Sequence, residues 1–559
     1  MSQHPKMDQI PLSNIGLLFI LFIILRYAYK SRLGSLKFVR GPLSPSWLFG
    51  NEYDIVHQLE VGKLETPWFN EYGLAFRYTG CFGEEILYVA DPKALQHILH
   101  ASSYHYSKTN DSRNNTRRLF GQGVLWAEGN THQRHRKALN PAFSASQLKT
   151  FLSLFQQETQ RLANKWQEQR LVQAQDSQET PVIDITKWIS RLTLDIIGKS
   201  AFEYDFQALD AKENKLASTL RSLFKSNAAT TKLTVLIRAF RRNLTYDPTF
   251  HNPLNPNHPL VLTNDDERQN RWLEVSNSTA RDILRQKGDI GHRGAEKGDK
   301  DILSVLVRSN ALEDPKKRLS DEEVLAQMST MILAGHETTG STSVWMFYEL
   351  ARHPDQQQRV WQEINEVRKK KLENGEEEGF TAHDYDSMPF FNAFIKEVLR
   401  FYPIVIGLFR NPDRDDVIPL AEPIISSTGQ KMAELPVKKG QRIHIHIPTY
   451  NRLKSVWGED ADTWNPERFL DEKKGTTLGV YANLLTFSGG VRSCIGWRFA
   501  LLELQSILEG LVSNFEFSID PSIEIMRAQA GVMQPLVRGK EKEGLQMPLK
   551  VKRRTLVGV

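Results

Sequence analysis

The stretch TFSGGVRSCIGWRFALLELQSILEGLV, from Thr486 to Val512, governs the interpretation of the whole sequence. It places Cys494 between glycines and directly ahead of a long apolar helical pattern. A cysteine at the start of a helix receives free backbone N–H groups and the positive end of the helix dipole, and both favour its thiolate form. A buried structural cysteine beside a helix is the alternative. The stretch by itself leaves both interpretations open.

The composition is that of an ordinary globular protein with a slight basic excess. The chain has 559 residues, 40% hydrophobic and 25% charged, with 72 Lys and Arg against 66 Asp and Glu. A net charge of +6 over this length does not favour nucleic-acid binding. Only two cysteines, Cys81 and Cys494, occur, which excludes a disulfide framework, a four-cysteine zinc site and an all-cysteine iron–sulfur cluster within one chain. The body is expected to face the cytosol, or at least not to depend on oxidation.

The amino-terminal residues predict a membrane anchor. Residues 15–25 carry no charge, and extending this run to residues 10–29 reaches about the 20 residues that span a bilayer. Basic residues gather after the run, which places the rest of the chain in the cytoplasm. A cleaved signal peptide is the alternative, but it needs the opposite charge order. Residues 1–30 are expected to form a segment with a transmembrane helix, followed by a basic, proline-rich hinge over residues 31–52 and one catalytic domain over residues 53–559.

Amphipathic helical patterns dominate the body, and strand-like alternation is sparse. The helical patterns cover residues 147–168, 183–201, 321–352, 356–371 and 390–401. The better strand patterns cover residues 83–91 and 441–450, and polar segments at 251–260, 285–300 and 369–380 are expected to be surface loops. The sequence therefore predicts a mainly α fold with small β-sheets.

Five positions of the opening stretch carry a family resemblance. Phe487, Gly490, Arg492, Cys494 and Gly496 form the pattern F-x-x-G-x-R-x-C-x-G, which resembles the heme-binding loop of the cytochrome P450 family. The resemblance implies that Cys494 ligates the iron of heme b, that Arg492 pairs with a heme propionate and that Phe487 shields the sulfur. The two glycines would allow a close approach to the porphyrin. A thiolate ligand to heme iron favours cleavage of the O–O bond of dioxygen.

A second motif, LAGHETTGS at residues 333–341, lies midway along a long helical pattern. Ala334 and Thr338 share one helix face at i and i+4, and glycine and threonine disfavour a helix interior. Such local conflicts often mark functional positions, although a packing kink in a core helix is the alternative. The motif is similar to the family's oxygen-binding groove, a distorted turn over the heme. By that resemblance Thr338 would hydrogen-bond the iron-bound peroxide, and Glu337 would relay protons.

A further pair of motifs resembles a structural part of the family. Glu397 and Arg400 lie at i and i+3, and Arg468 in WNPERF resembles the third member of a buried Glu–Arg–Arg network that fixes the heme loop. A solvated salt bridge is the alternative for the first pair.

Candidate propionate partners complete the resemblance. Arg136 and Arg410 resemble propionate-binding arginines, although a solvated surface arginine is the alternative for Arg410. His132 stands where the family usually has tryptophan, which leaves its contact with the heme open.

The resemblance runs from about residue 40 to the carboxyl end and implies one catalytic domain with the family's triangular-prism fold. The implied reaction is insertion of one oxygen atom from dioxygen into a C–H bond. The sequence contains no Gly-rich dinucleotide loop, so NADPH electrons would arrive through NADPH–cytochrome P450 reductase. Basic residues would form its docking face: Arg134, Arg136, Lys137 and Arg498. A reductase-independent isomerase or dehydratase and a non-catalytic heme binder are the alternatives.

The expected substrate is hydrophobic, because the segments that would surround the heme are mostly apolar. They are residues 121–125, 223–240, 404–409 and 530–537, together with Met331 and Ala334. Phrases at residues 41–51 and 418–432 resemble fungal, particularly basidiomycete, members, which suggests a terpenoid of secondary metabolism. A single-pass protein of the endoplasmic reticulum membrane, monomeric and with a cytosolic body, is expected. Its sequons at Asn110, Asn114, Asn243 and Asn277 would then stay unglycosylated.

Overall fold

The computed structural model describes residues 36–168, 180–210, 215–223, 230–244, 263–286, 300–376, 379–471 and 478–554. The expected membrane anchor at residues 1–30 and the expected loop at 251–260 lie outside these ranges. Among the helices that the structure describes, none combines the length and the apolar character needed to cross a bilayer.

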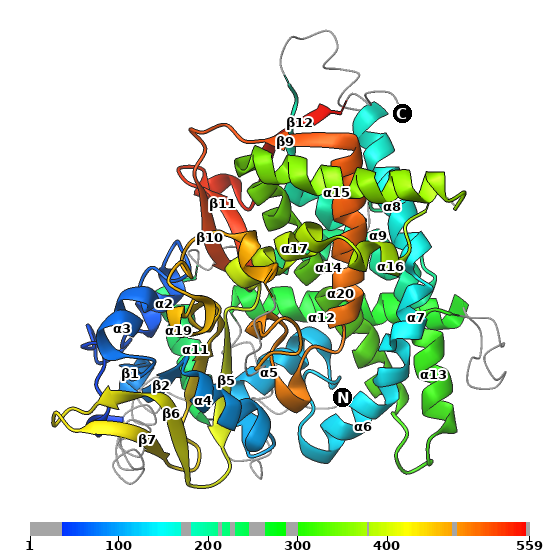
Figure 1. Cartoon of the computed structure of the whole chain (residues 1–559). Coiled ribbons are helices and arrows are strands. Elements are labelled where there is room, and N and C mark those ends of the chain that lie inside the picture. Colours follow the sequence, from blue (N-terminus) through cyan, green and yellow to red (C-terminus); the bar gives the residue numbers. More distant parts are fainter. Residues whose placement is uncertain are drawn as a thin grey trace.

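A single long helix organises the helical part of the molecule (Figure 1). Helix α14 (Asp321–Arg352) begins at a capping box in which Ser320 and Glu323 bond each other's backbone N–H. It packs against α9 (Ile185–Phe202) and α20 (Trp497–Asn514). The approach to α9 is close, because a Cβ at Gly335 would lie 2.7 Å from Cδ1 of Ile197. Small residues in α14 therefore bring the two backbones together.

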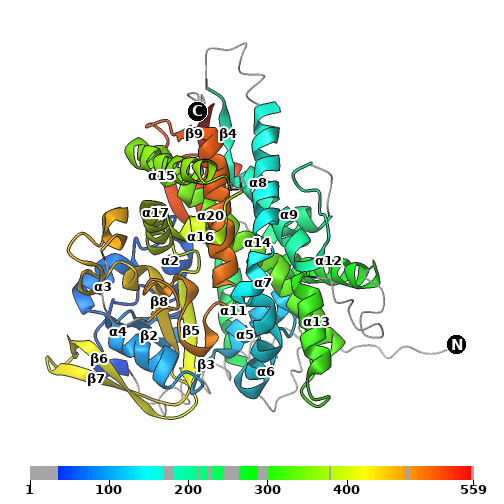
Figure 2. The same ribbon diagram turned by 45° about the vertical axis from the view of Figure 1, so that its right-hand side comes forward.

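The other helices surround this centre or cover the sheets (Figures 1 and 2). The longer ones are α5 (Asn110–Phe120), α6 (Gly129–Leu139), α8 (Leu152–Trp166), α10 (Lys215–Leu223), α11 (Lys232–Leu244), α12 (Asn264–Gln286), α13 (Ile302–Leu312), α15 (Pro354–Glu373) and α17 (Pro389–Phe401). The shorter ones are α2 (Glu52–His57), α3 (Glu65–Tyr72), α4 (Pro92–Gln96), α7 (Ala145–Lys149), α16 (Ala382–Asp386), α18 (Ile447–Tyr450) and α19 (Lys454–Trp457).

The strands form small sheets, most of them on the left of the view, with β9 and β12 at the top above the helices (Figure 1). The largest sheet has the order β1 (Ala75–Thr79), β2 (Glu85–Val89), β8 (Ile443–His446), β5 (Gly407–Pro412) and β3 (Tyr106–Lys108). Its β2–β8 pair is parallel, with Leu87 opposite Ile443, and its other pairs are antiparallel. The remaining pairings are the hairpins β6 (Asp416–Ile425) with β7 (Lys431–Val437) and β10 (Ile525–Ala530) with β11 (Val532–Val537), and the set β4 (Val182–Asp184), β12 (Pro548–Arg553) and β9 (Phe515–Ser518).

The predicted mainly helical fold with small sheets is confirmed, with local corrections. Residues 147–168 form two helices, α7 and α8, instead of one. The strand expected to run to Tyr450 ends at His446, because Pro448 cannot donate to a sheet ladder and lies at the start of α18. The loop expected from residue 369 begins only after α15 ends at Glu373. The hairpin β6–β7 was not predicted.

Candidate active site

The Cys494 loop is fixed by its own backbone. Two 3₁₀ turns, Leu485–Phe487 and Gly490–Arg492, precede α20, and the Cys494 N–H donates to the carbonyl of Phe487 at 2.9 Å. Gly490 has φ +67°, and a Cβ there would lie 1.7 Å from the Leu99 carbonyl oxygen. Gly496 caps α20 instead of adopting a positive φ. Of the two motif glycines, Gly490 is therefore the one whose positive φ and close neighbour both require glycine.

The Cys494 thiol faces a cavity of about 1380 Å³ within the protein. Burial raises the pKa of this thiol, while the Gly496 N–H and the nearby Arg136 guanidinium lower it. Metal coordination deprotonates a thiol outright, and these two groups would also favour the thiolate. Cys494 therefore lines a cavity and is not packed in a hydrophobic core.

The Glu397, Arg400 and Arg468 side chains form the predicted network beneath this loop. The Arg400 guanidinium and the Glu397 carboxylate are fully buried and joined at 2.6 and 2.7 Å, and Nε of Arg468 lies 3.3 Å from Glu397. Arg400 also donates to the Asn451 carbonyl at 2.9 Å. The Asn451 side chain in turn bonds Leu485 N and the Thr486 hydroxyl. The network therefore reaches the cysteine loop through Asn451.

Basic side chains from distant parts of the chain line the same cavity. Arg136 donates to the carbonyl of Ser493, next to the cysteine, at 2.7 Å. Arg410 on β5 is buried and donates to the carbonyl of Phe409 at 2.8 Å, and no salt bridge to it is found in the described ranges. Burial lowers the pKa of Arg410 to about 10, with further lowering by Arg492. A buried cation without a carboxylate partner is suited to an anionic ligand.

Arg492 and His132 also line the cavity but already have partners. Arg492 forms an ion pair with Glu128 and donates to the Ser103 carbonyl. The His132 ring is buried, with Nδ1 3.1 Å from the Tyr104 hydroxyl, and burial lowers its pKa to about 4. His132 is therefore neutral near pH 7.

These residues fit a heme. The cavity brings one thiol, a buried unpaired guanidinium and further basic side chains to a single space, and a porphyrin with an iron centre and carboxylates matches that donor set. Phe487, Gly496 and Ala334 line the same space. Every residue predicted from the sequence as a heme contact lines this cavity, except Gly490, which acts through the backbone of the loop.

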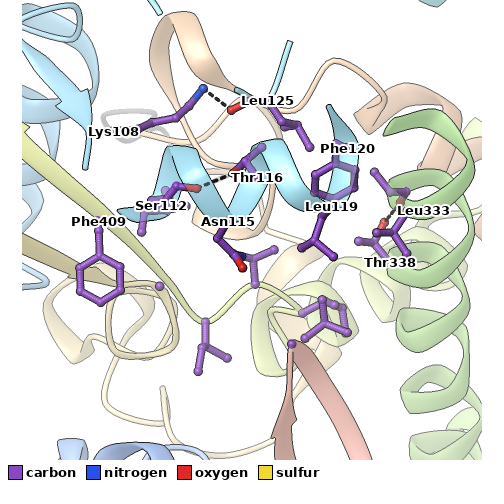
Figure 3. Close-up of a pocket in the computed structure, with 18 of the residues that line it drawn as sticks. Lys108, Ser112, Asn115, Thr116, Leu119, Phe120, Leu125, Leu333, Thr338 and Phe409 are labelled. Carbon is purple, nitrogen blue, oxygen red and sulfur yellow. Dashed lines mark hydrogen bonds between the residues drawn. The ribbon is translucent and has the colours of Figure 1, made fainter. Parts of the chain in front are cut away.

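Thr338 of α14 lies in the cavity wall (Figure 3), and Ala334 of the same helix also lines the cavity. The Thr338 hydroxyl donates to the Ala334 carbonyl at 2.7 Å, one turn earlier. Helix α14 is continuous through these residues, so the distorted turn implied by the resemblance does not appear. The hydroxyl bonds the backbone without breaking the helix.

Glu337 lies in this wall with its side chain 14% exposed. Burial raises the pKa of its carboxyl to about 7, opposed by a hydrogen bond from the Gln534 amide. A carboxyl with this pKa exchanges its proton near neutral pH.

One wall of the cavity was missed from the sequence. Asn115 and Leu119 on α5 point into the cavity, whereas Phe409 on β5, which also points into it, belongs to the expected segment 404–409 (Figure 3). The α5 sequence NDSRNNTRRLF resembles a polar surface segment, and only Leu119 and Phe120 at its end signal a buried role. The cavity also includes the expected residues Val124, Leu223, Met331, Ile404 and Val532.

Comparison with known proteins agrees with this geometry. A family model described as cytochrome P450 matches residues 40–540. Cytochrome P450 monooxygenase 128 of Postia placenta is 32% identical over 548 residues, which cover 95% of this chain and 94% of the relative. Cytochrome P450 monooxygenase claO of Ampulloclitocybe clavipes is 30% identical over 567 residues, which cover 97% of this chain and 99% of the relative.

The thiol loop and the cavity that it lines define a candidate heme-binding site, and the comparisons cover nearly the whole chain. The chain belongs to the cytochrome P450 family, and its curated relatives are basidiomycete monooxygenases. It is a monooxygenase of that family, with heme as the cofactor that the family implies.

Proposed function

We propose that this monooxygenase oxygenates an apolar terpenoid or related secondary metabolite, with NADPH electrons delivered by NADPH–cytochrome P450 reductase. The observation that carries the proposal is the shared cavity, which holds the Cys494 thiol together with Ala334, Glu337 and Thr338 of α14. A ligand thiol, a hydroxyl and a carboxyl that titrates near neutrality are the groups that oxygen activation needs.

Cys494 would hold the heme iron, and Arg136, His132, Arg410 and Arg492 would hold the propionates. When bound, heme supplies the oxidant that inserts oxygen into a C–H bond. The Gly496 N–H and Arg136 would keep the sulfur in its thiolate form.

Two residues of α14 would handle protons. The Thr338 Oγ1 holds its proton toward the Ala334 carbonyl, and rotation about the C–O bond turns that proton toward the cavity. Glu337, with a pKa of about 7, would release a proton into the cavity and recover it from solvent. Since Glu337 and Thr338 are adjacent, one short stretch of helix would supply both groups.

An apolar substrate is supported by the side chains around the cavity. Leu119 and Phe120 come from α5, Leu333 from α14 and Phe409 from β5 (Figure 3). Apolar walls of this kind bind apolar ligands by excluding water. The terpenoid assignment rests on the likeness to basidiomycete enzymes.

The reductase and the membrane are proposed partners. Arg498 is exposed, and no salt bridge to it is found where the chain is described. Arg134 and Lys137 of the expected docking face pair with Glu323 and Glu313 instead. Lys137 nevertheless keeps 69% of its side chain exposed, so the positive surface remains available to an acidic partner. An anchor at residues 1–30 would hold a monomeric catalytic domain on the cytosolic face of the endoplasmic reticulum.

Reconstitution of the heme-loaded protein with a diflavin NADPH reductase in lipid vesicles tests the proposal. A panel of sesquiterpenes, sterols, fatty acids and aromatics would be supplied under isotopically heavy dioxygen. We expect a terpenoid product that contains one heavy oxygen atom and requires both NADPH and the reductase.

Thr338→Ala is expected to divert NADPH consumption from product to hydrogen peroxide. Ser343→Ala is the matched control, since the Ser343 hydroxyl makes the same kind of bond in α14, to the Thr339 carbonyl at 2.9 Å, and Ser343 is not among the described residues that line the cavity. Product formed from a preformed peroxide without NADPH or reductase would instead identify an isomerase or dehydratase. Heme binding without turnover of any panel member would favour a non-catalytic binder.

A further inference from the structure

Gln534 is a buried polar side chain that joins the carboxyl-terminal hairpin to helix α14. It lies on β11, opposite Ala528 of β10, and is 2% exposed. Its Nε2 atom donates to Oε1 of Glu337 and, at 2.7 Å, to the hydroxyl of Ser341. Its Oε1 atom is buried, and no hydrogen-bond partner for it is found among the described residues.

The two acceptors of this amide are one helical turn apart. Glu337 and Ser341 lie at i and i+4, so they share one face of α14. The single Nε2 group bridges them and fixes the rotamer of the Glu337 side chain. Because Gln534 lies on a strand, its amide has a fixed position. The hydrogen bond from this amide holds the Glu337 carboxyl in one orientation, which the flexible glutamate side chain would not keep by itself.

We propose that Gln534 is a positioning residue that holds the Glu337 carboxyl in the cavity wall for proton transfer. This inference rests on the proton-handling role proposed above for Glu337. Gln534 does not itself exchange a proton in this account, because an amide is neutral at all working pH values.

Burial has the largest effect on the pKa of Glu337, and the hydrogen bond from the Gln534 amide opposes it. Nδ1 of His336 lies 3.4 Å from Oε2 of Glu337, but burial lowers the pKa of His336 to about 4, so the ring is neutral near pH 7. Glu503 of α20 is buried, and burial raises the pKa of its carboxyl well above the ordinary value. Within the described ranges the Gln534 amide is the side-chain donor to Glu337, and it favours the ionised carboxylate.

Infrared titration of the heme-loaded protein tests this inference without a substrate. The band of the protonated Glu337 carboxyl is assigned by its loss in Glu337→Gln. In the parent we expect this band to titrate near pH 7, and in Gln534→Met about one pH unit or more higher, because the donor to the ionised form is gone. An unchanged midpoint in Gln534→Met would overturn the inference.

Gln529→Met is the matched control. Gln529 is a glutamine of the paired strand β10, and its Oε1 has no partner among the described residues. We expect its substitution to leave the Glu337 midpoint in place. If Gln534→Met fails to fold, Ser341→Ala removes the second anchor and should shift the midpoint upward by a smaller amount, and no shift would again contradict the inference.

The two proposals fail in distinguishable ways. If Glu337→Gln leaves the fraction of NADPH electrons that reach product unchanged, the proton-handling role of Glu337 is wrong. If Glu337→Gln lowers that fraction while the infrared midpoint does not respond to Gln534, only the positioning role is wrong.

Discussion

Burial of the Glu337 carboxyl in the cavity wall disfavours its ionised form and so lowers the stability of the folded protein near neutral pH. Its carboxyl is mostly buried in the cavity wall, with one amide donor and a neutral histidine beside it. The sequence predicts the residue, through its motif. It does not predict the donor, because Gln534 lies 197 positions further along the chain and nothing local connects the two.

The raised pKa of Glu337 predicts a pH-dependent stability. Its ordinary pKa of 4.5 applies to the unfolded chain, and the folded value is about 7. Between these values the folded protein binds more protons, so the free energy of unfolding falls as pH rises through this window. We expect the parent to lose about 3 kcal/mol relative to Glu337→Gln between pH 4 and pH 8. Urea denaturation of both proteins at each pH checks this, and a gap that does not change with pH would contradict it.

At the scale of elements, the cysteine loop depends on contacts with a preceding segment. The turn Gly490–Arg492 packs against the helical turn His97–Ala101. A Cβ on Gly490 would clash with the Leu99 carbonyl oxygen of that turn. The motif predicts that glycine is needed there. The motif does not show why, because the neighbour that requires the glycine, Leu99, lies far away in the sequence and approaches Gly490 only in the folded chain.

Gly490→Ala is therefore expected to displace the loop. Gly429→Ala is the matched control, because Gly429 also has a positive φ, +84°, but nothing lies within 4 Å of its Cβ position. The control should cost about 1–2 kcal/mol of unfolding free energy from backbone conformation alone. Gly490→Ala should cost more and also lower the heme-to-protein ratio. Equal losses and equal heme content in the two variants would show that the Leu99 contact has no such role.

The buried ion-pair network yields a second prediction for the elements. Arg400→Leu leaves the Glu397 carboxylate in the core with Arg468 and the Asn465 N–H as its remaining partners in the described ranges, and we expect a loss of about 3–5 kcal/mol of unfolding free energy. Lys454→Ala breaks a pair whose side chains are 58% and 92% exposed, and should cost less than about 1 kcal/mol. Urea unfolding measures both. Similar small losses would mean that the network does not hold the loop.

At the scale of the whole molecule, the sequence predicts those helices and strands whose apolar residues recur with a regular local period. Helix α14 has the bounds that its pattern and caps indicate, residues 321–352. The hairpin β6–β7 and the α5 wall were missed, because their polar residues mask the pattern and their packing partners lie elsewhere in the chain. The Glu–Arg–Arg network needed the family resemblance, since an i, i+3 pair alone usually lies in solvent.

The membrane topology of the whole molecule has a direct check. A cytosolic body keeps its sequons from the glycosylation machinery, so Asn110, Asn114, Asn243 and Asn277 should carry no glycan when the full chain is expressed in a eukaryotic host. Glycosidase treatment should leave its electrophoretic mobility unchanged. A mobility shift would place the body in the lumen and reverse the proposed orientation.

Ligation of heme iron by Cys494 is the central claim, and the difference spectrum of the reduced, carbon monoxide-bound protein tests it most directly. The parent and Cys81→Ala should both show a Soret band shifted far to the red, because Cys81 is buried in a separate hydrophobic cluster. Cys494→Ala should lose that band. A parent band at the position typical of histidine ligation, or a red-shifted band that persists in Cys494→Ala, would contradict the account.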